Sequence, residues 1–145
     1  MAELFDSYLE HAIGDTPLVP LKNISSPSSG QVWLKLESGN PTGSYKDRMA
    51  YSVFKNAFAR GDITTGSRLV EYTGGSTGTS LAHIASRTGI QFIAVSSDAF
   101  AQSKIDSMLA YGAEVITIPS EDQKITPDLI AAMREKAYAI AEEPN

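Results

Sequence analysis

The sequence contains no cysteine, two histidines and no long run of apolar residues. Without cysteine the chain has no disulfide framework, no thiolate metal ligand and no cysteine nucleophile. The histidines, His11 and His83, lie far apart and have no acidic pair at ligand spacing, so we expect no metal site. No apolar stretch approaches the length of a membrane-spanning helix, and no basic segment followed by an apolar one opens the chain. We therefore expect a cytoplasmic protein without a membrane partner.

Basic residues are outnumbered as well. Lysine and arginine together number 12 against 17 aspartates and glutamates, which gives a formal charge of −5 and an isoelectric point near 4.9. This balance, with no local cluster of basic residues, disfavours a nucleic acid or an anionic membrane as a partner. A length of 145 residues with 42% hydrophobic content suffices for the core of one ordinary domain.

From residue 68 onward, strand and helix patterns alternate. Short apolar runs bounded by turn residues predict strands, and longer stretches with one apolar side predict helices. This alternation predicts βαβ units and an α/β fold, in which an open parallel sheet carries helices on both faces and forms three layers. The predicted elements are strand 68–72, turn 73–78, helix 79–87, strand 91–96, helix 101–111, strand 114–118 and helix 127–141.

The first part of the chain has a different pattern. Residues 18–21 and 32–36 predict two short strands. A loop rich in turn-forming residues, 38–43, then leads into a helix that ends near Gly61. The two early strands are thus separated from the regular βαβ run.

A lysine lies at the start of that helix. Ser44 is suited to cap the helix and Asp47 to complete a capping box, which leaves Lys46 in the first turn. The helix dipole disfavours a cation there, and burial favours the neutral amine that Schiff-base chemistry needs. The alternative is a lysine whose long side chain reaches solvent. At 3.6 residues per turn, Lys46 shares a face with apolar residues, namely Met49, Ala50, Val53 and Ala57.

The predicted turn 73–78 lies where ligands bind in parallel α/β sheets, at the carboxyl end of a strand. Its small residues let a ligand approach the backbone, and the free amides of the next helix favour a carboxylate or a phosphate. The spacing matches neither a P-loop nor a dinucleotide-binding fingerprint, and a plain connection is the alternative. The residues of this turn are Thr73, Gly74, Gly75, Ser76, Thr77 and Gly78.

Four motifs of this chain resemble those of the cysteine synthase-like enzymes, the fold type II, tryptophan synthase beta-like branch of the pyridoxal 5′-phosphate (PLP) enzymes. They occur in the family's order and at its spacing, and they cover the N-terminal half of such an enzyme. The motifs are Gly14-Asp15-Thr16-Pro17-Leu18, Lys35-Leu36-Glu37, Asn40-Pro41-Thr42-Gly43-Ser44-Tyr45-Lys46-Asp47-Arg48 and Val70-Glu71-Tyr72-Thr73-Gly74-Gly75-Ser76-Thr77-Gly78.

The resemblance implies a role for each candidate site. Lys46 would form the Schiff base with PLP and act as the general base at Cα, and residues 73–78 would bind the α-carboxylate of an amino-acid substrate. Ser76 stands where the family has an asparagine that contacts the cofactor. The implied reaction is β-elimination from an activated serine followed by β-replacement, as in the conversion of O-acetylserine and sulfide to cysteine.

Other functions remain open. Gly74 and Ser76 depart from the family's usual serine and asparagine, and Tyr45 resembles the phenylalanine of threonine synthase-like relatives. A threonine synthase or a serine/threonine dehydratase of the same fold is therefore the first alternative. A non-catalytic domain that binds an anion or a protein partner is an alternative of another class.

The resemblance also implies a domain organisation. Residues 1–37 would contribute two strands to a second domain, and residues 38–145 would form the small α/β domain that carries Lys46. The C-terminal domain, which supplies the phosphate-binding loop and the partner of the pyridine nitrogen, would lie outside the chain. We expect the chain alone to bind PLP weakly and to be weakly active or inactive, and the full-length enzyme to be a homodimer.

Overall fold

The computed structural model describes residues 7–24 and 30–143. Strands β3, β4 and β5 form a parallel sheet in that order, and β1 and β2 form a separate antiparallel pair. The elements are α1 (Ser7–Ala12), β1 (Leu18–Pro20), β2 (Trp33–Lys35), the 3-10 helix η2 (Glu37–Gly39), α2 (Lys46–Arg60), β3 (Arg68–Tyr72), α3 (Ser76–Thr88), β4 (Gln91–Ser97), α4 (Gln102–Ala110), β5 (Glu114–Ile118) and α5 (Pro127–Glu142).

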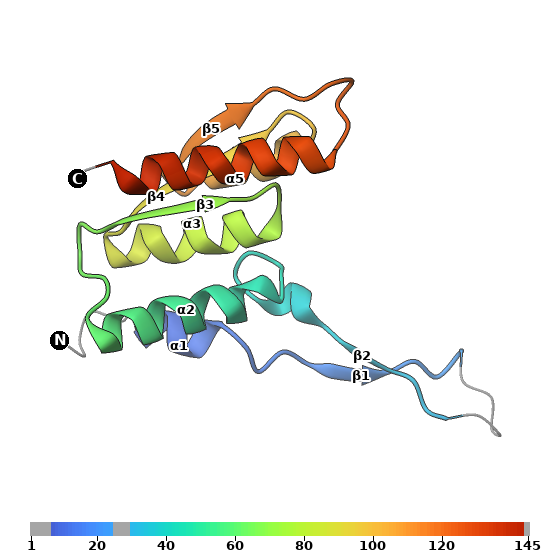
Figure 1. Cartoon of the computed structure of the whole chain (residues 1–145). Coiled ribbons are helices and arrows are strands. Elements are labelled where there is room, and N and C mark those ends of the chain that lie inside the picture. Colours follow the sequence, from blue (N-terminus) through green and yellow to red (C-terminus); the bar gives the residue numbers. More distant parts are fainter. Residues whose placement is uncertain (1–6, 25–29, 144–145) are drawn as a thin grey trace.

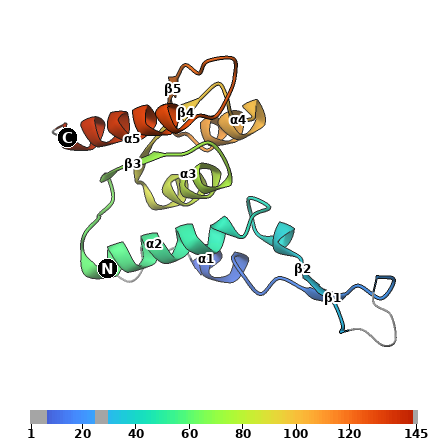
Figure 2. The ribbon, with the colours of Figure 1, turned by 45° about the vertical axis from the view of Figure 1, so that its right-hand side comes forward.

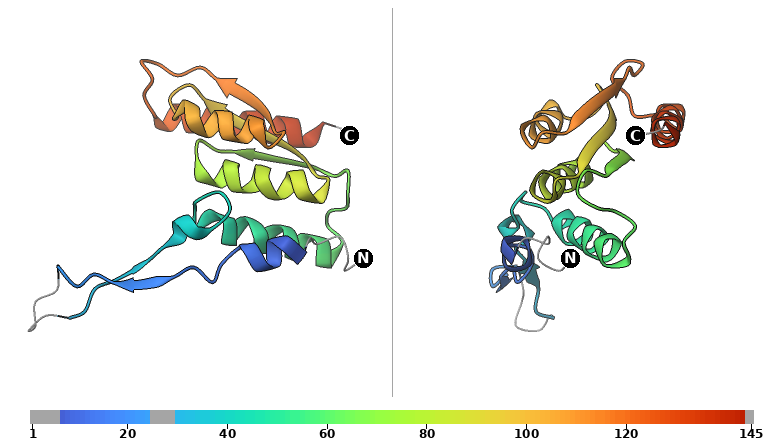
Figure 3. Two further views of the ribbon diagram at one scale, coloured as in Figure 1. Left: turned by 180° about the vertical axis from the view of Figure 1, so that it is seen from behind. Right: turned by 90° about the vertical axis from the view of Figure 1, so that its left-hand side faces the viewer.

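The parallel sheet is covered on both faces, which confirms the predicted three-layer α/β fold. Helix α5 packs on one face, and α3 and α4 pack on the other (Figures 2 and 3). Successive residues of β4 serve the two cores: Phe92 and Ala94 join the core on the α3 side, and Ile93 and Val95 join the core under α5. This alternation is the period of two that a β-strand imposes on its side chains.

Helix α2 forms a further layer, because it packs against α3 rather than on the sheet (Figure 1). Helix α3 is therefore enclosed, and its residues 78–85 are all buried. The predicted inner face of α2 was partly wrong, since Val53 is 47% exposed and Lys46 is half-buried. The buried residues of α2 are Asp47, Ala50, Phe54 and Ala57.

The β1–β2 hairpin extends away from the rest of the molecule (Figure 1). Its strands pair in the register Val19 opposite Leu34 and are each three residues long, shorter than predicted. The large apolar side chains of the hairpin lie in solvent, and Leu18 and Trp33 are 56% and 50% exposed. An isolated two-stranded ribbon is at best marginally stable in water. Within the described residues no helix is both long and apolar enough to cross a membrane.

A hydrogen-bonded cluster fixes the base of this hairpin. Arg48 on α2 forms a bidentate pair with Glu37, with Nε–Oε2 and Nη2–Oε1 both at 2.9 Å. The same carboxylate accepts from the Thr16 hydroxyl at 2.7 Å and from the Asn40 amide at 2.9 Å. The Asn40 Oδ1 atom in turn accepts from the backbone of Gly14 at 2.9 Å. Residues from three of the motifs, which are separate in the sequence, thus join the hairpin to α2.

We expect this cluster to make the stability of the fold depend on pH in the acidic range. The hydrogen bond from Arg48, with those from Thr16 and Asn40, lowers the pKa of Glu37 from 4.5 to about 2. Because the pKa is lower in the folded state, the stabilisation is complete above pH 4.5 and is lost as the pH falls toward 2. Thermal unfolding between these pH values should therefore show a weaker fall in Tm for Glu37→Gln than for the unsubstituted chain. Parallel curves for the two proteins would contradict this assignment.

Candidate active site

The site begins at the first turn of α2. The Lys46 amide donates to the Ser44 hydroxyl at 3.1 Å, so Ser44 satisfies the first amide of the helix although Tyr45 holds the N-cap position. Asp47 does not complete a capping box, contrary to the prediction. Its carboxylate instead accepts from the Thr42 amide at 2.8 Å and from the Thr42 hydroxyl at 2.6 Å. Gly43, with a φ of +75°, lets the chain reverse so that Thr42 faces Asp47.

Helix α3 begins at Ser76, three residues earlier than predicted. Thr73, which precedes the helix, accounts for this early start. Its Oγ1 accepts from the Gly78 amide at 3.0 Å and so satisfies an amide of the first helical turn. Among the described residues, no acceptor is found for the amides of Ser76 and Thr77. Two free amides at the positive end of a helix dipole form a binding site for an anion.

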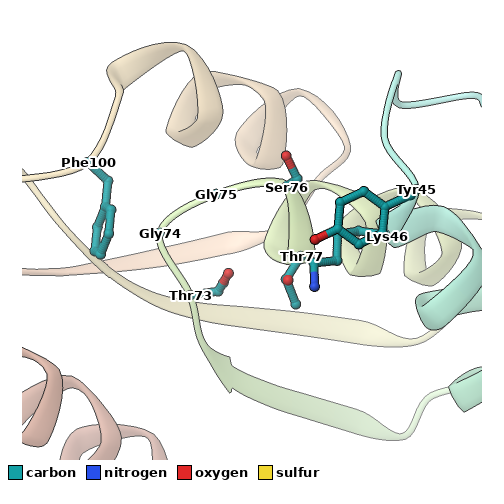
Figure 4. Close-up of a pocket in the computed structure, with 8 residues that line it drawn as sticks. All are labelled: Tyr45, Lys46, Thr73, Gly74, Gly75, Ser76, Thr77 and Phe100. Atoms are coloured by element: carbon teal, nitrogen blue, oxygen red, sulfur yellow. The ribbon is translucent and has the colours of Figure 1, made fainter. Parts of the chain in front are cut away.

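These two helix starts face one cavity of about 440 Å³. We call residues 73–78 the glycine turn. In Figure 4, Lys46 and Tyr45 lie on one side of the glycine turn and Phe100 lies on the other. Gly78 is not part of the lining. It is buried one step deeper, where a Cβ would overlap Met108 and Thr73. The lining residues are Tyr45, Lys46, Thr73, Gly74, Gly75, Ser76, Thr77 and Phe100.

The structure therefore brings the predicted lysine and five of the six predicted turn residues together around one cavity. Sequence reasoning missed Tyr45 and Phe100 as lining residues. The ring centroid of Tyr45 lies 4.8 Å from the Lys46 ammonium nitrogen, a cation–π contact between sequence neighbours. Phe100 follows the carboxyl end of β4, which is the ligand side of a parallel sheet, and this position was the available signal.

Thr42 connects the two helix starts. Its hydroxyl donates to Asp47 on α2 and lies 3.3 Å from the hydroxyl of Ser80 on α3. Asp47 and Ser80 are both completely buried and Thr42 is half-buried, so these polar contacts lie partly out of reach of water. This buried contact sets the position of Lys46 relative to the amides of α3.

The cavity fits a small ligand that carries a carbonyl group and an anionic group. Lys46 offers a primary amine, and the amides of Ser76 and Thr77 offer anion donors. A Cβ built on Gly75 would have no atom within 4 Å, so a ligand can approach the backbone there. The cavity volume also lies in the range of small-molecule sites. Such a site is of the kind found in enzymes that bind an aldehyde cofactor and an amino acid.

Comparison with known proteins agrees with this class. Residues 9–145 match the family described as "Pyridoxal-phosphate dependent enzyme". Cysteine synthase B of Salmonella typhimurium is 41% identical over 129 residues, which cover 88% of this chain and 43% of that protein. O-ureido-L-serine synthase of Streptomyces lavendulae is 40% identical over 135 residues, which cover 93% of this chain and 41% of that protein.

Solved structures give the same result. A hydrogen sulfide-producing enzyme from Fusobacterium nucleatum matches with a TM-score of 0.81 and 31% identity, covering 94% of this chain and 44% of that one. The O-acetylserine dependent cystathionine beta-synthase from Helicobacter pylori matches with a TM-score of 0.79 and 33% identity, covering 92% and 42%. The chain therefore belongs to the pyridoxal-phosphate dependent enzymes. It spans about two fifths of the length of the curated relatives it matches.

Proposed function

We propose that Lys46 is the residue that holds PLP and that the turn beside it binds the α-carboxylate of an amino-acid substrate. The observation that carries this proposal is the shared cavity, which Lys46, Ser76 and Thr77 all line, together with the lack of an acceptor for the amides of Ser76 and Thr77 among the described residues. Ser76 is in addition the proposed cofactor contact. The proposed carboxylate site comprises Thr73, Gly74, Gly75, Ser76, Thr77 and Gly78. Gly78 does not line the cavity; it lies behind the lining, where a side chain would overlap Met108 and Thr73.

In this proposal Lys46 handles the proton at Cα, and the residues of the turn bind the substrate carboxylate. When bound, PLP supplies an electron sink for a carbanion at Cα. The amine of Lys46 would hold the cofactor and, when free of it, would be the base that takes the proton at Cα of the substrate. The amides of Ser76 and Thr77 hold the carboxylate at the helix start. Thr73 accepts from Gly78 through its hydroxyl oxygen, so its hydroxyl proton remains available to the substrate.

For the whole protein we infer β-elimination and β-replacement on an activated serine, in the manner of a cysteine synthase. The names of the relatives support this reaction, because they include cysteine synthases, an O-ureido-L-serine synthase and an O-acetylserine dependent enzyme. A threonine synthase or a serine/threonine dehydratase is the second candidate, and the tyrosine beside the lysine, Tyr45, favours it.

The exposed hairpin supports the proposed domain organisation. Its large apolar side chains are between 44% and 56% exposed, namely Leu18, Val32, Trp33 and Leu34. A contiguous exposed apolar surface of this kind is typical of a surface that packs against another domain or protein. We assign this surface, within residues 1–37, to a second domain of the same protein, with residues 38–145 as the small α/β domain. A homodimer in the cytoplasm completes the proposal.

A substrate panel tests the proposed reaction. The protein at its full natural length, supplied with PLP, should form cysteine from O-acetyl-L-serine and sulfide. It should not release threonine from O-phosphohomoserine or 2-oxobutyrate from L-threonine. Threonine or 2-oxobutyrate as the main product would replace the cysteine synthase reaction by the second candidate. No turnover of any of the three substrates, with Lys46 unlabelled by PLP, would favour a non-catalytic domain.

A further inference from the structure

Phe100 and Gly74 form a matched pair at one end of the cavity. A Cβ built on Gly74 would overlap three carbons of the Phe100 ring, including Cγ. Because Cγ lies on the Cβ–Cγ axis, rotation of the ring about that bond cannot remove this overlap. The ring therefore occupies the space that a side chain at residue 74 would need. Glycine is the one residue type that permits this packing.

The ring is held in place from two sides. On its inner side, Phe100 packs against the core formed by Ile93, Val95 and α5. Its backbone belongs to a closed turn, because the Phe100 amide donates to the carbonyl of Ser97 at 3.2 Å. The carboxylate of Asp98 fastens this turn by accepting from the Ser120 amide at 2.8 Å. The position of the ring is thus set by its packing on this core and by the closed turn that carries it.

We propose that Phe100 is a positioning residue for the carboxylate site and acts through Gly74. By packing on the backbone of Gly74, the ring fixes the path of the turn, so that the amides of Ser76 and Thr77 stay directed at one point in the cavity. Its apolar face also removes water from this end of the site, which strengthens hydrogen bonds to a carboxylate. The ligand class is the carboxylate of an α-amino acid, and the inference rests on the proposed function in this respect.

A double-mutant cycle tests the inference on the full chain, with L-serine as the probe. Amide shifts of Ser76 and Thr77 in the ¹⁵N spectrum give its dissociation constant. Gly74→Ala should weaken binding about tenfold in the presence of Phe100, since a misdirected turn loses one good hydrogen bond. The same substitution should cause no loss after Phe100→Ala, because the overlap is gone.

Two further variants keep the outcome clear. Phe100→Leu retains an apolar side chain but not the ring, and should weaken L-serine binding even if Phe100→Ala does not fold. Phe58→Ala, a matched control, removes another half-buried phenylalanine that does not line the cavity. It should lower Tm and leave the dissociation constant unchanged. If Phe100→Leu behaves like Phe58→Ala, or if Gly74→Ala has one effect in both backgrounds, the inference is overturned.

The proposed function can fail independently. PLP followed by borohydride labels Lys46 in the unsubstituted chain if that proposal holds. Labelling of Lys46 without the predicted non-additivity would overturn the role of Phe100 alone. The predicted non-additivity without labelling would overturn the cofactor role of Lys46 and support the carboxylate site by itself.

Discussion

Lys46→Arg should abolish the covalent capture of PLP. After incubation with PLP and reduction by borohydride, peptide mass mapping of the unsubstituted chain should find the pyridoxyl group on Lys46. Arginine keeps the positive charge beside Tyr45, but its guanidinium does not lose a proton in proteins and cannot act as the nucleophile. The labelled peptide should therefore disappear, and any activity of the full-length protein should fall by several orders of magnitude.

Lys55 is the matched control for this experiment. It lies on the same helix, but its side chain is 53% exposed and pairs with Glu10 at 3.2 Å on the surface. Lys55→Arg should leave the labelling of Lys46 unchanged. Equal labelling of the two lysines in the unsubstituted chain would mean that Lys46 has no selective reactivity.

Asp47→Asn should produce the largest loss of stability among the polar residues near the site. The carboxylate is completely buried and accepts both from the Thr42 amide and from the Thr42 hydroxyl. An asparagine turns its NH₂ group toward one of these donors and leaves that donor unpaired in the interior. We expect a decrease of about 1–3 kcal/mol in the free energy of unfolding, measured by urea denaturation.

The same substitution should move Lys46 relative to α3, because Thr42 connects Asp47 to Ser80. Asp62→Asn serves as the control, since Asp62 forms an exposed pair with Arg60 and its removal should change stability by no more than about 0.5 kcal/mol. Equal effects of the two substitutions would show that the Asp47 carboxylate is not a buried acceptor.

Local sequence signals were sufficient for the regular part of the fold. Strands β3 and β5 have the predicted bounds, 68–72 and 114–118, because each is a short apolar run between turn residues. The end of α2 was also predictable, since Gly61 adopts a φ of +76° that favours glycine after a helix. The family motifs then predicted the membership that the comparisons confirm.

Three of the errors share a physical cause, because each depends on a side chain that lies outside the predicted element itself. Helix α3 starts early because Thr73 caps it from outside. The buried face of α2 is set by its contact with α3, so Phe54 is buried and Val53 is exposed. Phe100 reaches the cavity only because the turn after β4 closes beside the glycine turn after β3, an arrangement that a single segment does not encode.

The central claim is that Lys46 and the amides of Ser76 and Thr77 serve one site. The most direct test titrates L-serine into the chain incubated with PLP, and follows the borohydride labelling of Lys46 together with the two amide shifts. The amine of L-serine should displace Lys46 from the cofactor while its carboxylate binds at the start of α3. Protection of Lys46 and the amide shifts should therefore share one half-saturation concentration. Amide shifts without protection, or protection without amide shifts, would contradict a common site.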